Sequence, residues 1–263
     1  LPISNAELFG KVEEALAARG LAGCKTTAFT THGGARAFLR MDFTDASKKE
    51  LLKKSKKLGG ECGMSITLQN SFDGSLKAAF NVGVLRLVCL NGMVGLRNEV
   101  AISRKHTSKL AIEAFDYAFA EAATVFNKTL GVFEKLADSN ITHDGGHRIL
   151  DNLCYRHHLF SRKLGRQFAQ VWEAPTHEED KSRNLFNLYN AITQVTTHDI
   201  DAEDSDKVVH IQSRVVESLV KAGEDRGFYE SLLIARDDPK ERLLVADRKS
   251  TRLNSSHVSE SRM

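Results

Sequence analysis

Residues Asn70–Gly92 read NSFDGSLKAAFNVGVLRLVCLNG and combine turn signals with apolar, strand-like runs. Asp73-Gly74 and Asn91-Gly92 readily adopt the positive backbone angles that two-residue turns need, and Gly83 interrupts the run between them. The strands expected around these breaks cover residues 64–69, 76–81, 84–90 and 93–103. Strands joined by such short turns are typical of an antiparallel meander, which is the predicted centre of the fold.

The residues before this stretch predict a helix, a hairpin and a second helix. Ser4 with Glu7 three positions later matches a capping box, and the helix that it opens is expected to end at Gly20. Residues 26–43 predict two strands around a turn at His32-Gly33-Gly34. Residues 45–58 predict an amphipathic helix, whose outer face carries Lys49, Lys53, Lys56 and Lys57.

A long helical pattern follows the meander and begins near Thr107. Phe115, Phe126 and Phe133 recur in it at helical spacing, which indicates a buried stripe on a helix that lies across the sheet. Only helical patterns come after Gly145. They cover residues 149–172, about 178–195 and about 206–222.

These elements predict an α+β fold, with an antiparallel β-meander backed by a long helix and followed by a helical C-terminal part. We expect residues 1–140 to form the sheet-and-helix domain and residues 141–247 to form the helical part packed on it. Residues 248–263 abandon any apolar period and are rich in Ser and Arg. We expect them to form a disordered, non-native tail without a functional role.

Three blocks of the sequence occur in the order found in a known family. They are the turn with Asn70, Asp73, Gly74 and Ser75 followed by Arg86, Cys89 and Asn91, then the basic Arg104-Lys105-His106-Thr107, then Asn190 and Thr193 with the following His198. In this order they resemble the phage/plasmid-like family known as domain of unknown function 932. The resemblance implies an origin in a phage, plasmid or other mobile element, and it implies no particular reaction. Phe72 stands where many members carry His, so no imidazole role is carried over to that position.

The composition is that of a globular protein of 263 residues. Its formal charge of +3 permits a nucleic-acid partner without requiring one. The cysteines Cys24, Cys62, Cys89 and Cys154 lack Cys-x-x-Cys spacing, which argues against a zinc ribbon or a redox pair and favours reduced, buried thiols. No apolar run approaches the roughly 20 residues that cross a bilayer. We therefore expect a cytoplasmic protein of a bacterial host cell, without a membrane partner.

Known catalytic templates find no match. The chain lacks the Gly-x-Ser-x-Gly, His-Glu-x-x-His, P-loop and dinucleotide-binding patterns, so no catalytic residue and no cofactor are predicted. His143, His147, Cys154, His157 and His158 offer imidazole and thiolate groups that would suit zinc. Gly145-Gly146 separates the first pair, however, and the last two point about 100° apart on a helix. Structural or surface histidines are the favoured interpretation, so no metal is expected.

Two basic positions each have two interpretations. Arg86 lies in an apolar run where a strand would bury it, and a buried guanidinium needs an anion. A carboxylate and a phosphate are both suitable partners. The Arg104–Thr107 corner suits either an anion site at a helix N-terminus or a simple Thr107 cap.

The polar motif residues also have structural interpretations. Asn70, Asp73 and Ser75 could form a binding loop or close a turn on their own backbone. Asn190 and Thr193 share one helix face, where a bond from helix to sheet is favoured over a ligand contact. Cys89 is expected to be a buried thiol on the strand face opposite Arg86.

The leading hypothesis is a non-enzymatic nucleic-acid-binding protein of a phage, plasmid or other mobile element, acting in DNA recombination or replication. Clustered cations would meet the phosphates, with DNA expected in preference to RNA. The expected contacts are Lys49, Lys53, Lys56, Lys57, Arg104, Lys105, His106, Thr107, Arg148, Arg156, Arg162, Lys163 and Arg166. The element order is also similar to that of phage single-strand annealing proteins, which assemble into rings, so a homo-oligomer remains open.

Two alternatives come from other classes of protein. One is a host-interaction or anti-defence module that binds no nucleic acid. The other is an enzyme that uses polar groups in a crevice between sheet and helix, with Asp73, Arg86, His106 and His198 as its candidate residues.

Overall fold

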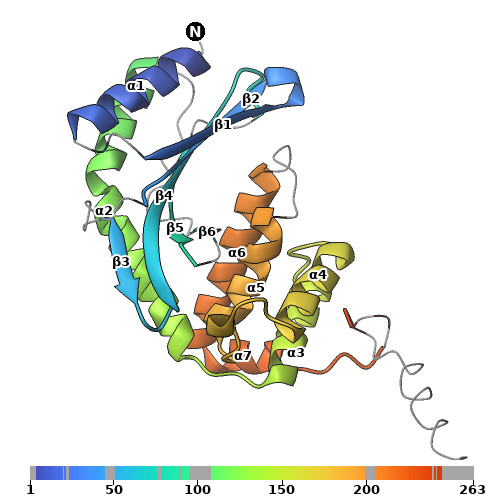
Figure 1. Cartoon of the computed structure of the whole chain (residues 1–263). Coiled ribbons are helices and arrows are strands. Elements are labelled where there is room, and N and C mark those ends of the chain that lie inside the picture. Colours follow the sequence, from blue (N-terminus) through green and yellow to red (C-terminus); the bar gives the residue numbers. More distant parts are fainter. Residues whose placement is uncertain are drawn as a thin grey trace, which may run out of the picture.

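The computed structural model describes residues 4–19, 21, 24–44, 51–75, 79–88, 90–94, 108–198, 205–238, 240 and 242–244 (Figure 1). Its strands are β1 (Lys25–Thr31), β2 (Arg36–Asp42), β3 (Leu52–Ser55), β4 (Gly60–Ser71), β5 (Ala79–Arg86) and β6 (Asn91–Val94). Its α-helices are α1 (Asn5–Ala18), α2 (Ser108–Asp138), α3 (His143–Tyr155), α4 (Arg162–Glu173), α5 (Leu185–His198), α6 (Ser205–Glu224) and α7 (Arg226–Leu232). Two short 3₁₀ helices are η1 (His32–Gly34) and η2 (Glu178–Asp180). The predicted α+β class, with helices at the C-terminal end, is confirmed.

The described strands form one antiparallel sheet in the order β1-β2-β4-β5-β6, with β3 also paired to β4. β4 is the central strand. Its Ser65 lies opposite Asp42 of β2 on one side and Gly83 of β5 on the other. β1 and β2, β3 and β4, β4 and β5, and β5 and β6 pair in sequential order, as expected for a meander, whereas β2 pairs with β4 across the intervening β3.

The two faces of the sheet differ in chemistry because successive residues of a strand point to opposite sides. One face is apolar and buried, with Leu39 and Met41 of β2, Ile66 and Leu68 of β4, and Phe80 of β5. Helices α1 and α2 lie on this side of the sheet (Figure 1), and their apolar side chains belong to the same buried cluster. Each such side chain, once fully buried, contributes about 1.5–3 kcal/mol to folding.

Helix α1 begins as predicted. Ser4 precedes its first residue, and the Ser4 hydroxyl accepts a hydrogen bond from the backbone N–H of Glu7 (3.1 Å). Leu8, Val12 and Leu16 form its buried stripe against the sheet and α2.

Helix α2 joins the sheet to the C-terminal helices. Of its predicted Phe stripe, Phe126 and Phe133 are fully buried, whereas the side chain of Phe115 lies outside the described residues. The Phe133 ring lies 6.0 Å from the ring of Phe186 and 5.5 Å from that of Tyr189, both on α5. The apolar cluster continues from there through α3 to α7. None of the helices in the described ranges is long and apolar enough to cross a bilayer.

The helix predicted over residues 45–58 is wrong where the structure describes it, because residues 52–55 form strand β3. β4 extends beyond the end of β2, and its backbone groups from Gly60 to Gly63 need hydrogen-bond partners, which β3 supplies. Gly59 (φ +75°) ends the turn between β3 and β4 and Gly60 (φ +140°) begins β4, both in conformations that favour glycine. This pairing outweighs the local helical pattern.

The strands predicted over residues 76–81 and 84–90 form a single strand where they are described, which is β5. Gly83 continues the ladder opposite Ser65 instead of forming a turn. Arg86 pairs directly with Asn91, Leu90 before it has φ +53°, and Asn91 and Gly92 begin β6. A glycine weakens a strand without ending it when both neighbouring strands hold it in place.

The helical pattern over residues 149–172 is interrupted, so that α3 and α4 are separate helices. His158, with φ +52°, lies in the break between them. The helix predicted over residues 178–195 begins only at Leu185, after η2, because Asn184 caps it by accepting the N–H of Asn187 (2.8 Å). The third predicted helix agrees with α6, and α7 was not predicted.

Candidate functional site

The second face of the sheet is polar. The register places the following residues on it: Lys25, Thr27 and Phe29 of β1, Arg36, Phe38, Arg40 and Asp42 of β2, Ser65, Thr67 and Gln69 of β4, and Asn81 of β5. These eleven residues are the polar sheet face. They alternate in each strand with the apolar residues that face α1 and α2, or with small residues of the edge strand β1. The alternation positions a row of polar groups away from the core.

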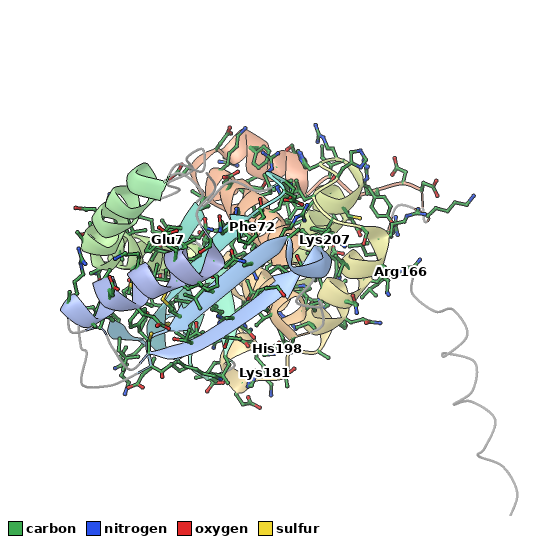
Figure 2. All side chains as sticks on the ribbon, turned by 90° about the horizontal axis from the view of Figure 1, so that it is seen from above. Glu7, Phe72, Arg166, Lys181, His198 and Lys207 are labelled. Carbon is green, nitrogen blue, oxygen red and sulfur yellow. The ribbon has the colours of Figure 1, made fainter. Side chains whose placement is uncertain are left out.

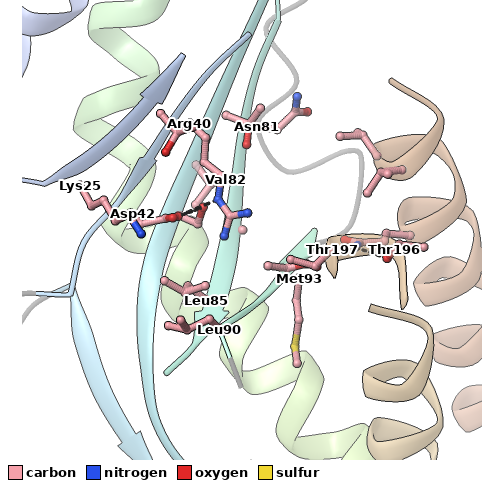
Figure 3. Close-up of a pocket in the computed structure, with 18 of the residues that line it drawn as sticks. Lys25, Arg40, Asp42, Asn81, Val82, Leu85, Leu90, Met93, Thr196 and Thr197 are labelled. Carbon is pink, nitrogen blue, oxygen red and sulfur yellow. Dashed lines mark hydrogen bonds and ion pairs between the residues drawn. The ribbon is translucent and has the colours of Figure 1, made fainter. Parts of the chain in front are cut away.

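A cavity of about 410 Å³ lies where the polar sheet face meets α5 and α6 (Figure 3). Lys25, Arg40, Asp42 and Asn81 line it from the strands. Its helical side is formed by Thr196 and Thr197 of α5 and by Val208, Val209 and Gln212 of α6. Gln212 donates to the Thr196 hydroxyl (2.7 Å), which ties the two helices together at the wall of the cavity.

Arg40 and Asp42 form the charged centre of this cavity. Arg40 Nε donates to Asp42 Oδ1 at 2.9 Å, and the Ser65 hydroxyl donates to the same oxygen at 2.6 Å. A Cβ at position 92 would lie 2.8 Å from an Arg40 nitrogen, so Gly92 leaves the room that this guanidinium occupies. The Arg40 side chain keeps 27% of its surface exposed, against 11% for Asp42. A bound anion can therefore reach the guanidinium more readily than the carboxylate.

Two aromatic rings lie on the same face. Phe29 of β1 and Phe38 of β2 are direct cross-strand partners, and their rings stack with centroids 5.0 Å apart and planes 12° from parallel. Phe38 is buried, whereas Phe29 is partly exposed and lines the cavity. The sheet thus presents a partly exposed aromatic ring, Phe29, near Arg40.

The structure brings together five of the motif residues in a buried network between the sheet and α5. Arg86 donates to Asp180 (2.5 Å), and Asn190 donates to the other oxygen of the same carboxylate (2.8 Å). Asn91 donates to the side-chain oxygen of Asn190 (2.9 Å). The partner of Arg86 in the structure is therefore a carboxylate, the first of the two partners considered for it.

The same network includes Thr193 and His198. The Thr193 hydroxyl donates to the carbonyl of Asn190 (3.0 Å), and His198 Nε2 lies 3.0 Å from the side-chain oxygen of Asn91. The expected helix-to-sheet bond of Asn190 is confirmed. Asp180 was missed because it lies in an acidic run that predicts a solvated helix start. Because a buried arginine needs an anionic partner, Arg86 itself indicated that such a carboxylate must exist.

The turn residues of the motif lie at the opposite end of the sheet from this network. Asp73 Oδ1 accepts from the backbone N–H (2.9 Å) and the hydroxyl (2.5 Å) of Ser75, and these bonds hold the pKa of Asp73 below its ordinary value. Gly74 has φ +71°, and Asn70 donates to the side chain of Asn5 on α1 (2.9 Å). These residues close a turn and anchor α1, which is the structural interpretation.

Of the candidate residues for an enzymatic crevice, those that the structure describes are not assembled around the cavity. Neither Asp73 nor Arg86 lines it. Arg86 is fully buried, and Asp73 lies in the exposed turn. Arg104, Lys105, His106, Thr107 and Cys89 lie outside the described residues, as does Lys49.

The remaining basic candidates lie on two separate groups of elements. Lys53, Lys56 and Lys57 are exposed on β3 and the turn after it, where Lys57 pairs with Asp138 of α2 (2.7 Å). Of the second group, Arg148 pairs with Asp144 within α3 (2.7 Å).

Further cations of α3 and α4 are also engaged in helix contacts. Arg156 donates to the carbonyl of Ser231 on α7, and Arg162 lies over the Tyr155 ring with 5.1 Å to its centroid. Lys163 and Arg166 are exposed, and Figure 2 shows Arg166 at the far side of the molecule from Glu7 of α1. The α3–α4 cations therefore serve partly to hold the helices together.

The five residues considered for zinc do not form one cluster. Cys154 is buried and contacts the carbonyl of Phe160, and burial raises its pKa to about 11. His157 packs against Phe228, with ring centroids 5.7 Å apart, and burial lowers its pKa. Only His143 and His147 approach each other, with ring centroids 4.9 Å apart.

These features define an α+β protein whose antiparallel sheet buries its apolar face under helices and turns its polar face toward a cavity. The profile of the family described as Domain of unknown function (DUF932) matches residues 1–222, and the chain belongs to this family. The resemblance to domain of unknown function 932 is thus confirmed. No curated protein and no solved structure matches the chain.

Proposed function

We propose that this protein binds single-stranded nucleic acid on the polar sheet face, with DNA preferred over RNA. The observation that supports this most directly is the presence of cations, amide and hydroxyl groups and a partly exposed aromatic ring on one face of one sheet, beside a cavity. Each of these groups has a counterpart in a nucleotide: the phosphate, the base face, and the polar edges of base and sugar.

The charge of the polar sheet face favours a polyanion. Within its eleven residues, Lys25, Arg36 and Arg40 are cations and Asp42 is the one carboxylate. Lys25 is exposed at the rim and Arg40 lies deeper in the cavity, so phosphates could be contacted at two depths. Such contacts give affinity that tolerates sequence and weakens as salt rises.

The aromatic pair favours a single strand. Bases stack on aromatic side chains with about 1–3 kcal/mol each, and their faces are accessible only when the strand is unpaired. Phe29 is partly exposed, and the buried Phe38 ring on the neighbouring strand stacks on one side of it. This pair supplies the stacking surface that the basic helices lack.

The size of the cavity fits one base or nucleotide. Pockets for small organic ligands measure about 300–1,000 Å³, and this cavity of about 410 Å³ lies within that range. Thr67, Gln69 and Asn81 on the sheet provide donors and acceptors for base edges or sugars.

The biological setting belongs to the same proposal. The resemblance to a phage/plasmid-like family supports a role in the replication or recombination of a mobile element. Lys163 and Arg166 on α4 are exposed cations that could extend the path of a longer strand, and they retain part of the basic surface expected from the sequence.

A salt-titrated binding assay tests the proposal. Fluorescence anisotropy of a labelled oligothymidylate of about 20 nucleotides is measured between about 50 and 200 mM salt. With about three phosphate contacts, affinity is expected to fall roughly 20-fold over this range. Lys25→Glu on the sheet is compared with Lys128→Glu, which makes the same change in charge at an exposed residue of α2, on the other side of the sheet.

The outcomes separate the alternatives. Loss of affinity in Lys25→Glu but not in Lys128→Glu supports the sheet face. If only Arg162→Glu and Lys163→Glu lose affinity, the nucleic acid binds at α4 instead. If the parent binds no oligonucleotide at low salt, a host-interaction module is favoured.

A further inference from the structure

We propose that His143, His147 and Glu173 form a binding site for a divalent transition-metal ion of the zinc type. His143 Nε2 lies 3.2 Å from Glu173 Oε2, and His147 Nε2 lies 2.8 Å from the same oxygen. One ligand atom from each residue lies within 4.8 Å of the other two. Two imidazole nitrogens and a carboxylate oxygen therefore converge on one point.

The fold of α3 places the two histidines together. They stand at positions i and i+4, which share one face of a helix, and this spacing is the one used by paired histidines that bind zinc from a helix. Thr142 fixes the helix start by accepting the N–H of Gly145 at 2.9 Å. Gly145 and Gly146 continue the helix, so they do not separate the histidines as the sequence suggested.

The carboxylate of Glu173 comes from α4, which packs closely against α3 at Gly146. A Cβ at position 146 would lie 2.3 Å from Trp172, so only glycine lets the indole pack directly on α3. Trp172 Nε1 donates to the carbonyl of His143 (3.0 Å), and the indole stacks with the His143 ring at 6.3 Å between centroids. Glu173, the next residue, is thereby held over both histidines.

Arg183 fixes the other side of Trp172. Its guanidinium lies 4.4 Å from the centre of the indole and donates to the Trp172 carbonyl. The position of Glu173 is therefore set by packing, and the three ligands need little rearrangement to receive an ion.

The ligand set indicates the kind of ion. Imidazole suits Zn²⁺, Cu²⁺, Fe²⁺ and Ni²⁺, whereas Mg²⁺ and Ca²⁺ prefer oxygen ligands alone. Two histidines and one glutamate are a set found in zinc sites that leave a position for water. The side chains of His143 and Glu173 are 44% and 53% exposed, so an ion can enter and water can complete its coordination. The inference is independent of nucleic-acid binding.

Isothermal titration with Zn²⁺ tests the site in the full chain after treatment with a chelator. We expect one ion per chain, together with a visible absorption spectrum when Co²⁺ replaces Zn²⁺ and no heat with Mg²⁺. His147→Gln and Glu173→Gln should each weaken Zn²⁺ binding at least about 100-fold, because loss of even an outer partner costs roughly 10–100-fold. His210→Gln, an exposed histidine on α6, is the matched control and should bind as the parent does.

Circular dichroism checks that each variant keeps its helices, and His143→Gln replaces any variant that does not. The proposal is overturned if the parent chain takes up no Zn²⁺, or if the ligand variants bind it as tightly as the His210→Gln control.

Discussion

The side chain of Asn91, on β6, donates a 2.9 Å hydrogen bond to the side chain of Asn190, on α5, across 99 positions of sequence. Both residues are almost completely buried, so their amides depend on protein partners. Asn190 also donates to Asp180, which binds Arg86 of β5. This connection fixes α5 at the edge of the sheet, and with it the helical wall of the cavity.

Asn190→Ala is expected to lower the free energy of unfolding by at least about 2 kcal/mol, because it leaves buried groups of Asn91 and Asp180 without this partner and each loss costs about 1–3 kcal/mol. Urea denaturation measures the change. Gln194→Ala, one turn later on α5, removes a bond to Thr176 on the more exposed side and should cost less than about 1 kcal/mol. Equal losses in the two variants would contradict a special role for Asn190.

Asp180→Ala is expected to destabilise the protein by about 3–5 kcal/mol, since it leaves the fully buried Arg86 without its carboxylate. The adjacent exposed pair of Glu178 and Lys181 provides the comparison, and Glu178→Ala should change stability by less than about 1 kcal/mol. Thermal and urea unfolding of both variants are measured together. A loss below about 1 kcal/mol in Asp180→Ala would show that Arg86 does not depend on this carboxylate.

Gly146→Ala is expected to cost about 1–3 kcal/mol, because the new methyl group would overlap Trp172 and push α4 away from α3. Gly131→Ala on α2 is the matched control. A Cβ there meets nothing within 4 Å, so the better helix propensity of Ala should stabilise the protein by up to about 1 kcal/mol. In denaturation experiments the free energy of unfolding should fall in Gly146→Ala and rise in Gly131→Ala. Destabilisation of similar size in both variants would contradict this expectation.

Asp151 should make the protein less stable as pH rises. Burial raises its pKa above the ordinary value, although the N–H of Leu243, which donates to it at 2.8 Å, opposes the shift. Between the unfolded pKa of about 3.9 and the higher folded pKa, the folded state binds more protons, so stability falls with pH across that window.

Asp151→Asn keeps an acceptor for Leu243 and cannot ionise. This variant should therefore be more stable than the parent at pH 7, and the difference should shrink toward about pH 4. Urea denaturation at both pH values measures it. A difference that does not change with pH would contradict the raised pKa.

Local signals predicted the parts of the fold that depend on neighbouring residues. The Ser4 cap, the hairpin around Gly33 and the Phe126–Phe133 stripe each involve groups within one element or one turn, and each was found as predicted. The family motif could also be recognised in the sequence, whereas the buried hydrogen-bond network that its residues form could not be predicted. That network depends on Asp180, which meets Arg86 only through tertiary folding.

The errors came from contacts between distant segments. Residues 52–55 have a helical pattern but pair with β4, and Gly83 resembles a turn but lies between two strands. The polar sheet face contains no run of lysine or arginine, so the basic patterns of the sequence did not indicate it. The signal for this face is the strand period of two: Arg36, Phe38 and Arg40 recur at every second position and therefore point to the same side of β2.

Binding of a single strand on the polar sheet face, as proposed, requires a base to stack on Phe29. The most direct measurement is the affinity of Phe29→Ala for the labelled oligothymidylate, compared with that of Phe72→Ala. Phe72 is a second exposed phenylalanine, in the turn after β4 and outside the cavity lining. Loss of one stacked base should weaken binding by about fivefold or more in Phe29→Ala and leave Phe72→Ala unchanged. Equal affinities of both variants and the parent would contradict the claim.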